Sequence, residues 1–353
     1  MRSSVVPVFE PVSPQAAEMR DLFVKVLAIS GVIFAVMATL IVLAIVRFRA
    51  RPGDALPVQD HGSERREIIW MLGPILVVAW LAAVTTKLVL SINSHAVVDP
   101  PSDQPARLIV TGHQWWWEAR YPLEQWPSAS GDATSTDVLV ANEIHIPVGT
   151  PIRVAIEAAD VIHCFWVPQL ARKIDAIPGR TNHIWLQADQ PGTYQGFCAE
   201  FCGTQHAWMR FLVIAQPQAE FDAWLASQRS PAPTPEAAQA ALAATGGQLF
   251  RSMACVDCHA FGDVGTRTPV GPDLTHLAQR TILGAGVIGN SPEDLRRWLE
   301  NPQAVKPGSK MPDFRLTGPQ IDALMAYFGV TSPTPSTAPP SLSRPPTPTG
   351  GAR

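Results

Sequence analysis

The chain has 353 residues, a net charge of -3, 46% hydrophobic residues and 16% charged residues. This length suggests more than one domain, and a near-neutral chain without a long basic run is not expected to bind nucleic acid. The five cysteines are too few for a disulfide scaffold, and they fall in two groups whose tight spacing favours metal or cofactor chemistry.

Two apolar stretches near the N-terminus predict membrane-spanning helices at residues 22–46 and 67–91. Each is long enough to cross roughly 30 Å of hydrocarbon. The intervening loop, residues 47–66, carries five arginines, whereas the connector at residues 92–106 carries no Lys or Arg. By the positive-inside rule the loop is cytoplasmic. The N-terminal segment, residues 1–21, and everything after the second span are therefore expected on the extracytoplasmic side.

Residues 107–228 are rich in β-branched and aromatic residues, with turn signals between the runs. Short strands at this spacing predict an all-β antiparallel sandwich or barrel. A Pro-rich linker at residues 229–235 leads to residues 236–330, where several helical stretches predict a compact all-α domain. The remaining residues, 331–353, are mostly Pro, Ser, Thr and Gly and are expected to form a disordered tail.

The helical domain contains a Cys-x-x-Cys-His motif, formed by Cys255, Cys258 and His259, which is the pattern of c-type heme attachment. The two thiols would form thioether bonds to the heme, and His259 would bind its iron. A redox dithiol is the alternative for the cysteine pair. Met311 is the candidate second axial ligand, since methionine opposite histidine raises the potential of a cytochrome c. The domain resembles class I cytochromes c, which implies that the Pro272 carbonyl accepts a hydrogen bond from the histidine.

A second group of donors lies in the run CAEFCGTQHAWM, which contains Cys198, Cys202, His206 and Met209, and His163 lies upstream. Thiolates, imidazoles and a thioether are the ligands that select copper or other soft transition metals. A disulfide between the two cysteines is the alternative, because an extracytoplasmic compartment is oxidising. Blue-copper sites use one cysteine, two histidines and a weak methionine, so a second cysteine would allow two metals to share the thiolates.

This donor pattern resembles the dicopper CuA centre of cytochrome c oxidase subunit II. The runs GHQWWW, DAIPGR and PGTYQGFCAEFCG and the helical hairpin extend the resemblance over almost the whole chain. The appended heme motif is similar to that of caa3-type oxidases, in which a cytochrome c is fused to subunit II. The resemblance implies a Greek-key cupredoxin-like fold, two bridging cysteines, one histidine for each copper, a weak methionine and one backbone carbonyl ligand. The implied ligands are His163, Cys198, the Glu200 carbonyl, Cys202, His206 and Met209.

The resemblance also implies roles for three further residues. The Glu200 side chain would help to bind magnesium at the interface with the catalytic subunit, unless it simply faces solvent. Trp115 would be the tryptophan through which electrons enter, and a packing role is the alternative. Glu67 would lie at the mouth of a proton-uptake channel, although the helix macrodipole alone favours a carboxylate there. Cys164 departs from the family, which usually has serine beside the histidine, and we interpret it as structural.

As a whole, the resemblance implies the electron-input subunit of a heme-copper terminal oxidase in a bacterial inner membrane. A soluble or membrane cytochrome c, or an upstream complex, would reduce the heme c, which would reduce the dicopper centre. Subunit I would then reduce oxygen with proton translocation, and subunits I and III are the expected partners. Two alternatives stay open: the copper subunit of a nitric oxide reductase, and a membrane-anchored copper-binding or delivery protein.

Overall fold

The computed structural model describes residues 7–53, 62–93, 105–126, 137–232, 235, 237–265 and 270–330. It forms two compact units, Met1–Gln104 and Pro105–Arg353. Most of the predicted connector and the whole predicted tail at residues 331–353 lie outside the described residues, as do two positions of the Pro-rich linker.

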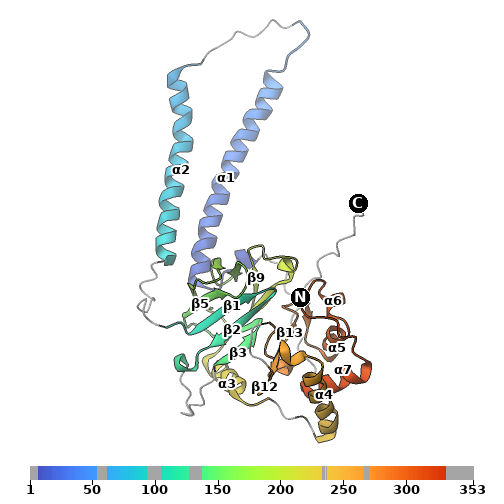
Figure 1. Ribbon diagram of the computed structural model, residues 1–353. Coiled ribbons are helices and arrows are strands. Elements are labelled where there is room, and N and C mark those ends of the chain that lie inside the picture. Colours follow the sequence, from blue (N-terminus) through green and yellow to red (C-terminus); the bar gives the residue numbers. More distant parts are fainter. Residues whose placement is uncertain are drawn as a thin grey trace. The chain divides into compact units, whose positions relative to one another are not determined.

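The first unit contains two long antiparallel helices, α1 (Pro14–Arg47) and α2 (Glu64–Asn93) (Figure 1). The Ser13 hydroxyl caps α1 by accepting a hydrogen bond from the Ala16 N–H at 3.0 Å, and Pro14 follows in the first helical position, where no N–H is needed. The helix α1 begins before residue 22, where the first membrane span is predicted to begin, and α2 begins before residue 67, the predicted start of the second. With 34 residues, α1 is about 51 Å long, more than a bilayer core requires.

The second unit begins with a sandwich of two five-stranded sheets, in the strand orders β3-β2-β1-β5-β8 and β4-β10-β9-β6-β7. The strands of the first sheet are β1 (Leu108–His113), β2 (Trp116–Tyr121), β3 (Val138–Ala141), β5 (Ile152–Ala158) and β8 (Asn182–Leu186). Those of the second sheet are β4 (Glu143–Pro147), β6 (His163–Trp166), β7 (Ile174–Ala176), β9 (Gly192–Cys198) and β10 (Arg210–Gln216).

Most strand pairs are antiparallel, as the sequence predicts, but β1 pairs with β5 and β4 pairs with β10 in parallel. Several strands that follow one another in the chain, such as β3 and β4, lie in different sheets. Some strands that pair within a sheet are therefore joined by long connections rather than by hairpins. Asn142 makes the passage from β3 to β4, with a positive φ of 61°. Asparagine tolerates this conformation, and the Asn142 side-chain oxygen accepts a hydrogen bond from the Trp117 N–H at 2.9 Å.

Aromatic side chains fill the space between the two sheets. Trp117, Phe165 and Phe211 are fully buried. Their ring centroids lie between 4.7 and 5.7 Å apart. The helix α3 (Gln218–Arg229) covers one end of the sandwich and buries Phe221 against Trp126, at 4.9 Å between ring centroids. This rigid frame carries the loops described below.

The remaining part of the unit, for which the sequence predicts a cytochrome c-like domain, is mainly helical and is called the cytochrome module below. Its helices are α4 (Ala240–Ser252), α5 (Pro292–Glu300), α6 (Pro302–Val305) and α7 (Gly318–Tyr327). It also has two small ladders, formed by β11 (Ala260–Phe261) with β12 (Val264–Gly265) and by β13 (Ile282–Leu283) with β14 (Ile288–Gly289). Its core contains Phe250, Leu295, Leu299, Ile321, Leu324 and Phe328. Short 3-10 helices occur throughout the chain at Pro7–Phe9, Leu123–Gln125, His206–Trp208, Ala237–Gln239, Cys255–Asp257 and Leu277–Gln279.

Candidate metal and heme centres

Five of the predicted soft donors meet at one end of the β-sandwich. His163 begins β6 and Cys198 ends β9, while Cys202, His206 and Met209 lie on the loop between β9 and β10. The Cys198 Sγ is 3.9 Å from His163 Nδ1 and 3.8 Å from Cys202 Sγ. The Cys202 Sγ is in turn 3.7 Å from His206 Nδ1 and 3.8 Å from Met209 Sδ. The cluster thus has two central sulfurs with one imidazole beside each, which suits two metals that share both thiolates.

The sixth predicted donor, the Glu200 backbone carbonyl, also reaches this cluster. Its oxygen lies 3.2 Å from the Cys198 Sγ, whereas the Glu200 side chain is exposed. The structure gives no disulfide between Cys198 and Cys202, because their sulfurs are 3.8 Å apart and a disulfide needs about 2.05 Å.

The two neighbouring cysteine thiols differ in acidity. The hydrogen bond between their sulfurs lowers the pKa of Cys198 and raises the pKa of Cys202. Burial opposes ionisation of both sulfurs. A metal ion takes cysteine ligands as thiolates, so its binding here would displace the proton that the two sulfurs share.

The His163 ring is oriented by a carboxylate. Its Nε2 lies 2.9 Å from Asp160 Oδ1, and the imidazole N–H must be the donor in this bond. In the neutral ring, Nδ1 then carries a lone pair that faces the sulfurs. A carboxylate fixes the histidine tautomer in the same way in many metal sites. Burial disfavours the charged imidazole, but the hydrogen bonds to Cys198 and Asp160 outweigh it and raise the pKa of His163. No sequence pattern selects Asp160 beyond its place three residues before His163.

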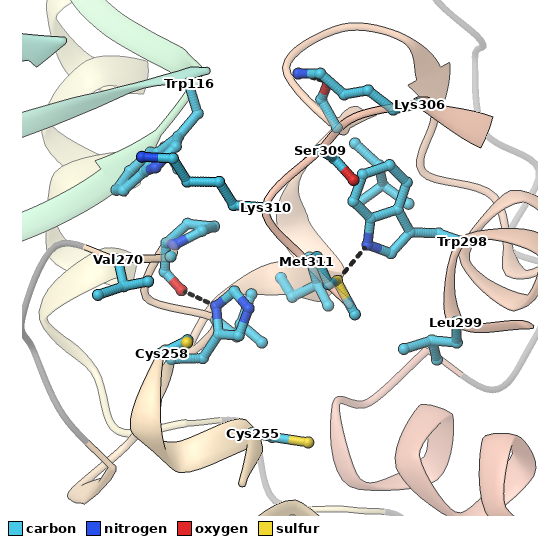
Figure 2. A pocket seen from close by; sticks show the side chains of 18 of the residues that line it. Trp116, Cys255, Cys258, Val270, Trp298, Leu299, Lys306, Ser309, Lys310 and Met311 are labelled. Carbon is cyan, nitrogen blue, oxygen red and sulfur yellow. Dashed lines mark hydrogen bonds between the residues drawn. The ribbon is translucent and has the colours of Figure 1, made fainter. Parts of the chain in front are cut away.

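The second candidate centre is a cavity of about 410 Å³ in the cytochrome module. Cys255 and Cys258 line it from the short helix after α4 (Figure 2). The rest of its wall is largely apolar and includes Phe250, Leu277, Leu283, Leu295, Leu299, Leu324 and Phe328. An apolar cavity with two thiols at its margin suits a covalently attached porphyrin.

His259 lines the same cavity and is also held in one tautomer. Its Nδ1 donates a hydrogen bond to the Pro272 carbonyl at 2.7 Å, as the resemblance to class I cytochromes c implies. Burial lowers the pKa of His259 despite this bond. Burial thus favours the neutral ring, in which Nε2 is the nitrogen left to bind iron.

Met311 and Trp298 form another part of the cavity wall (Figure 2). The Trp298 indole N–H lies 3.1 Å from the Met311 Sδ and donates to it. This contact orients the thioether. The sequence contained no sign of it, because Trp298 belongs to α5 and Met311 to a loop beyond α6.

Trp115 lies between the two centres. It lines the cavity of the cytochrome module, and its indole N–H donates to the Cys202 carbonyl at 3.0 Å. The Gln114 side-chain amide donates to the same carbonyl at 2.8 Å. A short covalent and hydrogen-bonded path therefore connects the cavity wall to one of the two central sulfurs.

Comparisons with known proteins agree with this division of the chain. The family model for the periplasmic domain of cytochrome c oxidase subunit II matches residues 107–216, and the model for the transmembrane domain of the same subunit matches residues 8–88. A cytochrome c model matches residues 243–329.

A relative from Alkalihalophilus pseudofirmus, named cytochrome c oxidase subunit 2, is 35% identical over 324 residues, which cover 90% of this chain and 89% of the relative. The chain belongs to the cytochrome c oxidase subunit II family. A second relative of that name, from Bacillus sp. (strain PS3), is 32% identical and covers 80% of this chain and 79% of its own. The solved periplasmic domain of subunit II of cytochrome oxidase of Bradyrhizobium japonicum is 34% identical, with a TM-score of 0.31, over 37% of this chain and 96% of that chain.

Membership in this family confirms the predicted resemblance and the predicted fold class: a membrane-anchored helical pair, a cupredoxin-like sandwich and a cytochrome c domain. Subunit II is part of a heme-copper oxidase, an oxidoreductase. The family implies copper for the sandwich and heme for the helical domain. The ligand assignments, the magnesium site and the roles of Trp115 and Glu67 stay predictions. Glu67 lies in the first turn of α2, in the other unit of the chain.

Proposed function

We propose that this subunit II receives electrons at a covalently bound heme c and passes them through a dicopper centre to the catalytic subunit I, which reduces oxygen with proton translocation. The observation that carries the proposal is the presence of two complete donor sets in one compact unit, joined by the contact between Trp115 and the Cys202 carbonyl. When bound, the heme and the copper pair would supply one-electron redox chemistry.

In the copper centre, Cys198 and Cys202 would bridge both metals, and His163 and His206 would each bind one. Met209 would be a weak ligand of one copper and the Glu200 carbonyl a ligand of the other. The ligand-bearing strands and loop belong to a buried β-sandwich, and both cysteines and Met209 are themselves buried. Buried, preformed ligands keep the geometry nearly constant when the charge of a centre changes, which suits electron transfer.

In the heme centre, Cys255 and Cys258 would form the thioether bonds, and His259 and Met311 would be the axial ligands. The Pro272 carbonyl would hold the imidazole in position and raise its basicity. The Trp298 indole would keep the methionine sulfur directed at the iron.

The partners and the orientation follow from the same reasoning. The arginines at the end of α1, just after it and in the first turn of α2 support a cytoplasmic loop, which would place both redox modules on the periplasmic side of a bacterial inner membrane. Subunits I and III would contact the two helices, and a cytochrome c or an upstream complex would be the donor. The exposed Glu200 side chain would contribute to a magnesium site at the subunit I interface, and Glu67 would act in proton uptake.

The test is a comparison of two cysteine variants of the full chain in its assembled oxidase. Cys198→Ser should abolish the multiline electron paramagnetic resonance signal of an electron shared by two coppers. Cys164→Ser is the matched control, because burial raises the pKa of Cys164 to about 12 and keeps its thiol protonated. The control should retain the signal, the copper content and the covalent heme. A wild-type protein with a single-copper signal, or with no covalent heme, would contradict the proposal.

A further inference from the structure

A buried carboxylate of the copper module, Glu143, is bonded to the cytochrome module. Glu143 begins β4 and is 5% exposed. Its Oε1 accepts hydrogen bonds from the Thr281 N–H at 2.7 Å, the Thr281 hydroxyl at 3.0 Å and the Ile282 N–H at 2.8 Å. These donors belong to the segment that enters β13, far along the chain. The carboxylate therefore fixes the position of this segment on the sandwich.

A buried lysine of the cytochrome module makes the reciprocal contact. Lys306 follows α6 and is 4% exposed. Its Nζ donates to the Trp115 carbonyl at 3.0 Å and to the Gly284 carbonyl at 2.9 Å. Lys306 thus links the backbone of Trp115, whose indole contacts the Cys202 carbonyl, to the loop that follows β13.

Further contacts surround these two. The Arg210 N–H donates to the Ala285 carbonyl at 3.1 Å. Lys310, which precedes Met311, lies 3.6 Å from the Asp160 carboxylate, the same group that orients His163. Through Asp160, Lys310 therefore connects the loop that carries Met311 to His163 of the proposed copper site.

Burial raises the pKa of Glu143 and lowers the pKa of Lys306 to about 7, which shows the cost of desolvating each group. Buried ionisable groups of this kind select one arrangement of the surfaces that bury them. Removing a carboxylate or an ammonium group from water is costly unless its hydrogen bonds are replaced. A shifted docking position would leave Glu143 or Lys306 desolvated without these partners. Such contacts therefore contribute mainly to the specificity of the position, more than to the strength of the association.

The copper module also completes the heme cavity. Five of the residues that line it belong to the β-sandwich and its loops: Gln114, Trp115, Trp116, Ala141 and Asn142. Figure 2 shows Trp116 bordering the cavity on the side of the copper module, with Lys310 beside it. Without the sandwich, this side of the cytochrome module would be open to solvent.

We propose that the cytochrome module is held in one fixed position on the copper module by Glu143 and Lys306, and that this junction keeps Trp115 between the heme cavity and Cys202. The inference rests on the proposed function for its redox consequence, but the junction itself does not depend on bound metal. Both residues are positioning residues, since neither belongs to the proposed ligand sets. An external donor would then have to reach the heme from another side of the cytochrome module, because the side facing the copper centre is already covered.

The junction is tested first without reference to any cofactor, by hydrogen exchange of the full chain. The Thr281 and Ile282 amides should exchange slowly in the wild type. Glu143→Ala should accelerate them about tenfold or more, since a hydrogen bond to a charged group is lost at each. Glu300→Ala, which removes an exposed carboxylate on α5, should change neither amide. Rapid exchange of both amides in the wild type, or no effect of Glu143→Ala, would overturn the proposal.

The second test measures electron transfer from heme to copper in the assembled oxidase at increasing solvent viscosity. A fixed junction gives a single rate that is independent of viscosity, whereas a swinging module gives a rate that falls with it. The double variant Glu143→Ala/Lys306→Met should slow the transfer about tenfold through misalignment and make it viscosity-dependent, with unchanged heme content and copper spectrum. Glu300→Ala/Lys173→Met is the control pair and should behave as the wild type. A viscosity-dependent wild type would refute the fixed junction, whereas missing copper or heme would refute the proposed function and leave the exchange result standing.

Discussion

Gly112 and Gly271 each lie against the ring of a histidine that we propose as a metal ligand. A Cβ atom on Gly112 would lie 2.8 Å from His163 Cδ2, and one on Gly271 would lie 2.5 Å from His259 Cε1. Both distances are too short for carbon atoms in contact. The absence of a side chain at Gly112 and Gly271 therefore leaves the space that the His163 and His259 rings occupy.

Replacing either glycine with alanine should displace the neighbouring ring at a cost of about 1–3 kcal/mol for overpacking. In Gly271→Ala the heme should remain attached through Cys255 and Cys258, while the absorption spectrum should lose the signature of the histidine–iron bond. In Gly112→Ala the copper content or the electron paramagnetic resonance spectrum should change and the heme spectrum should not. Gly318→Ala is the control, since a Cβ there meets no atom within 4 Å. Unchanged spectra in both variants would contradict the steric argument.

At the scale of the elements, α5 supplies the indole that contacts the Met311 sulfur. The serine cap at Ser291 sets the start of this helix by accepting a hydrogen bond from the Asp294 N–H at 3.0 Å, and Leu295 and Leu299 anchor it in the core. Trp298 therefore has a fixed base, and its N–H has a defined direction. The helix α5 carries no proposed ligand, but its Trp298 orients the proposed ligand Met311.

Trp298→Phe keeps an aromatic ring in place but removes this donor. The loss of one hydrogen bond should weaken the hold on the methionine by about 1 kcal/mol, and the reduction potential of the heme should fall, because methionine ligation raises it. A potentiometric titration of the assembled oxidase measures the shift. Trp224→Phe, on α3 and stacked on His145, should leave the potential unchanged. Equal potentials in wild type and Trp298→Phe would show that the hydrogen bond has no part in ligation.

Local spacing explains which parts of these elements could be predicted. The heme motif and the run from Cys198 to Met209 lie within single short segments, so their donors must be close whatever the fold. The contacts of Trp298 and Lys306 depend on how separate segments pack, and no spacing encodes them. The same limit applies to the parallel pairing of β1 with β5, since only the passage of the chain between sheets produces it.

For the molecule as a whole, apolar side chains remain exposed next to the proposed copper ligands. Phe201 is 76% exposed and precedes Cys202, and Ile162 is 46% exposed and precedes His163. Exposed apolar residues that gather beside a functional site mark a protein interface. In a subunit II, we expect the catalytic subunit to cover them, because the proposed copper centre would deliver electrons to that subunit.

Phe201→Ser should accordingly weaken the retention of subunit I during purification in detergent. The copper spectrum should persist. It must be recorded, because the centroid of the Phe201 ring lies only 5.8 Å from that of the His206 ring. An unchanged spectrum distinguishes a lost interface from a damaged copper centre. Leu242→Ser, at an exposed apolar position on α4, is the control. Full retention of subunit I together with slower reduction by the donor would assign the surface to the donor instead.

The cavity wall contributed by Trp116 and Asn142 has a consequence for biogenesis. A heme can reach Cys255 and Cys258 most easily while the cytochrome module still stands apart from the sandwich. Thioether formation should therefore precede closure of the two modules. The copper module comes earlier in the chain and can fold first. A chain that fails to acquire heme would then present an unfilled cavity at its own junction, where quality-control proteases would find it before the subunit joins the oxidase.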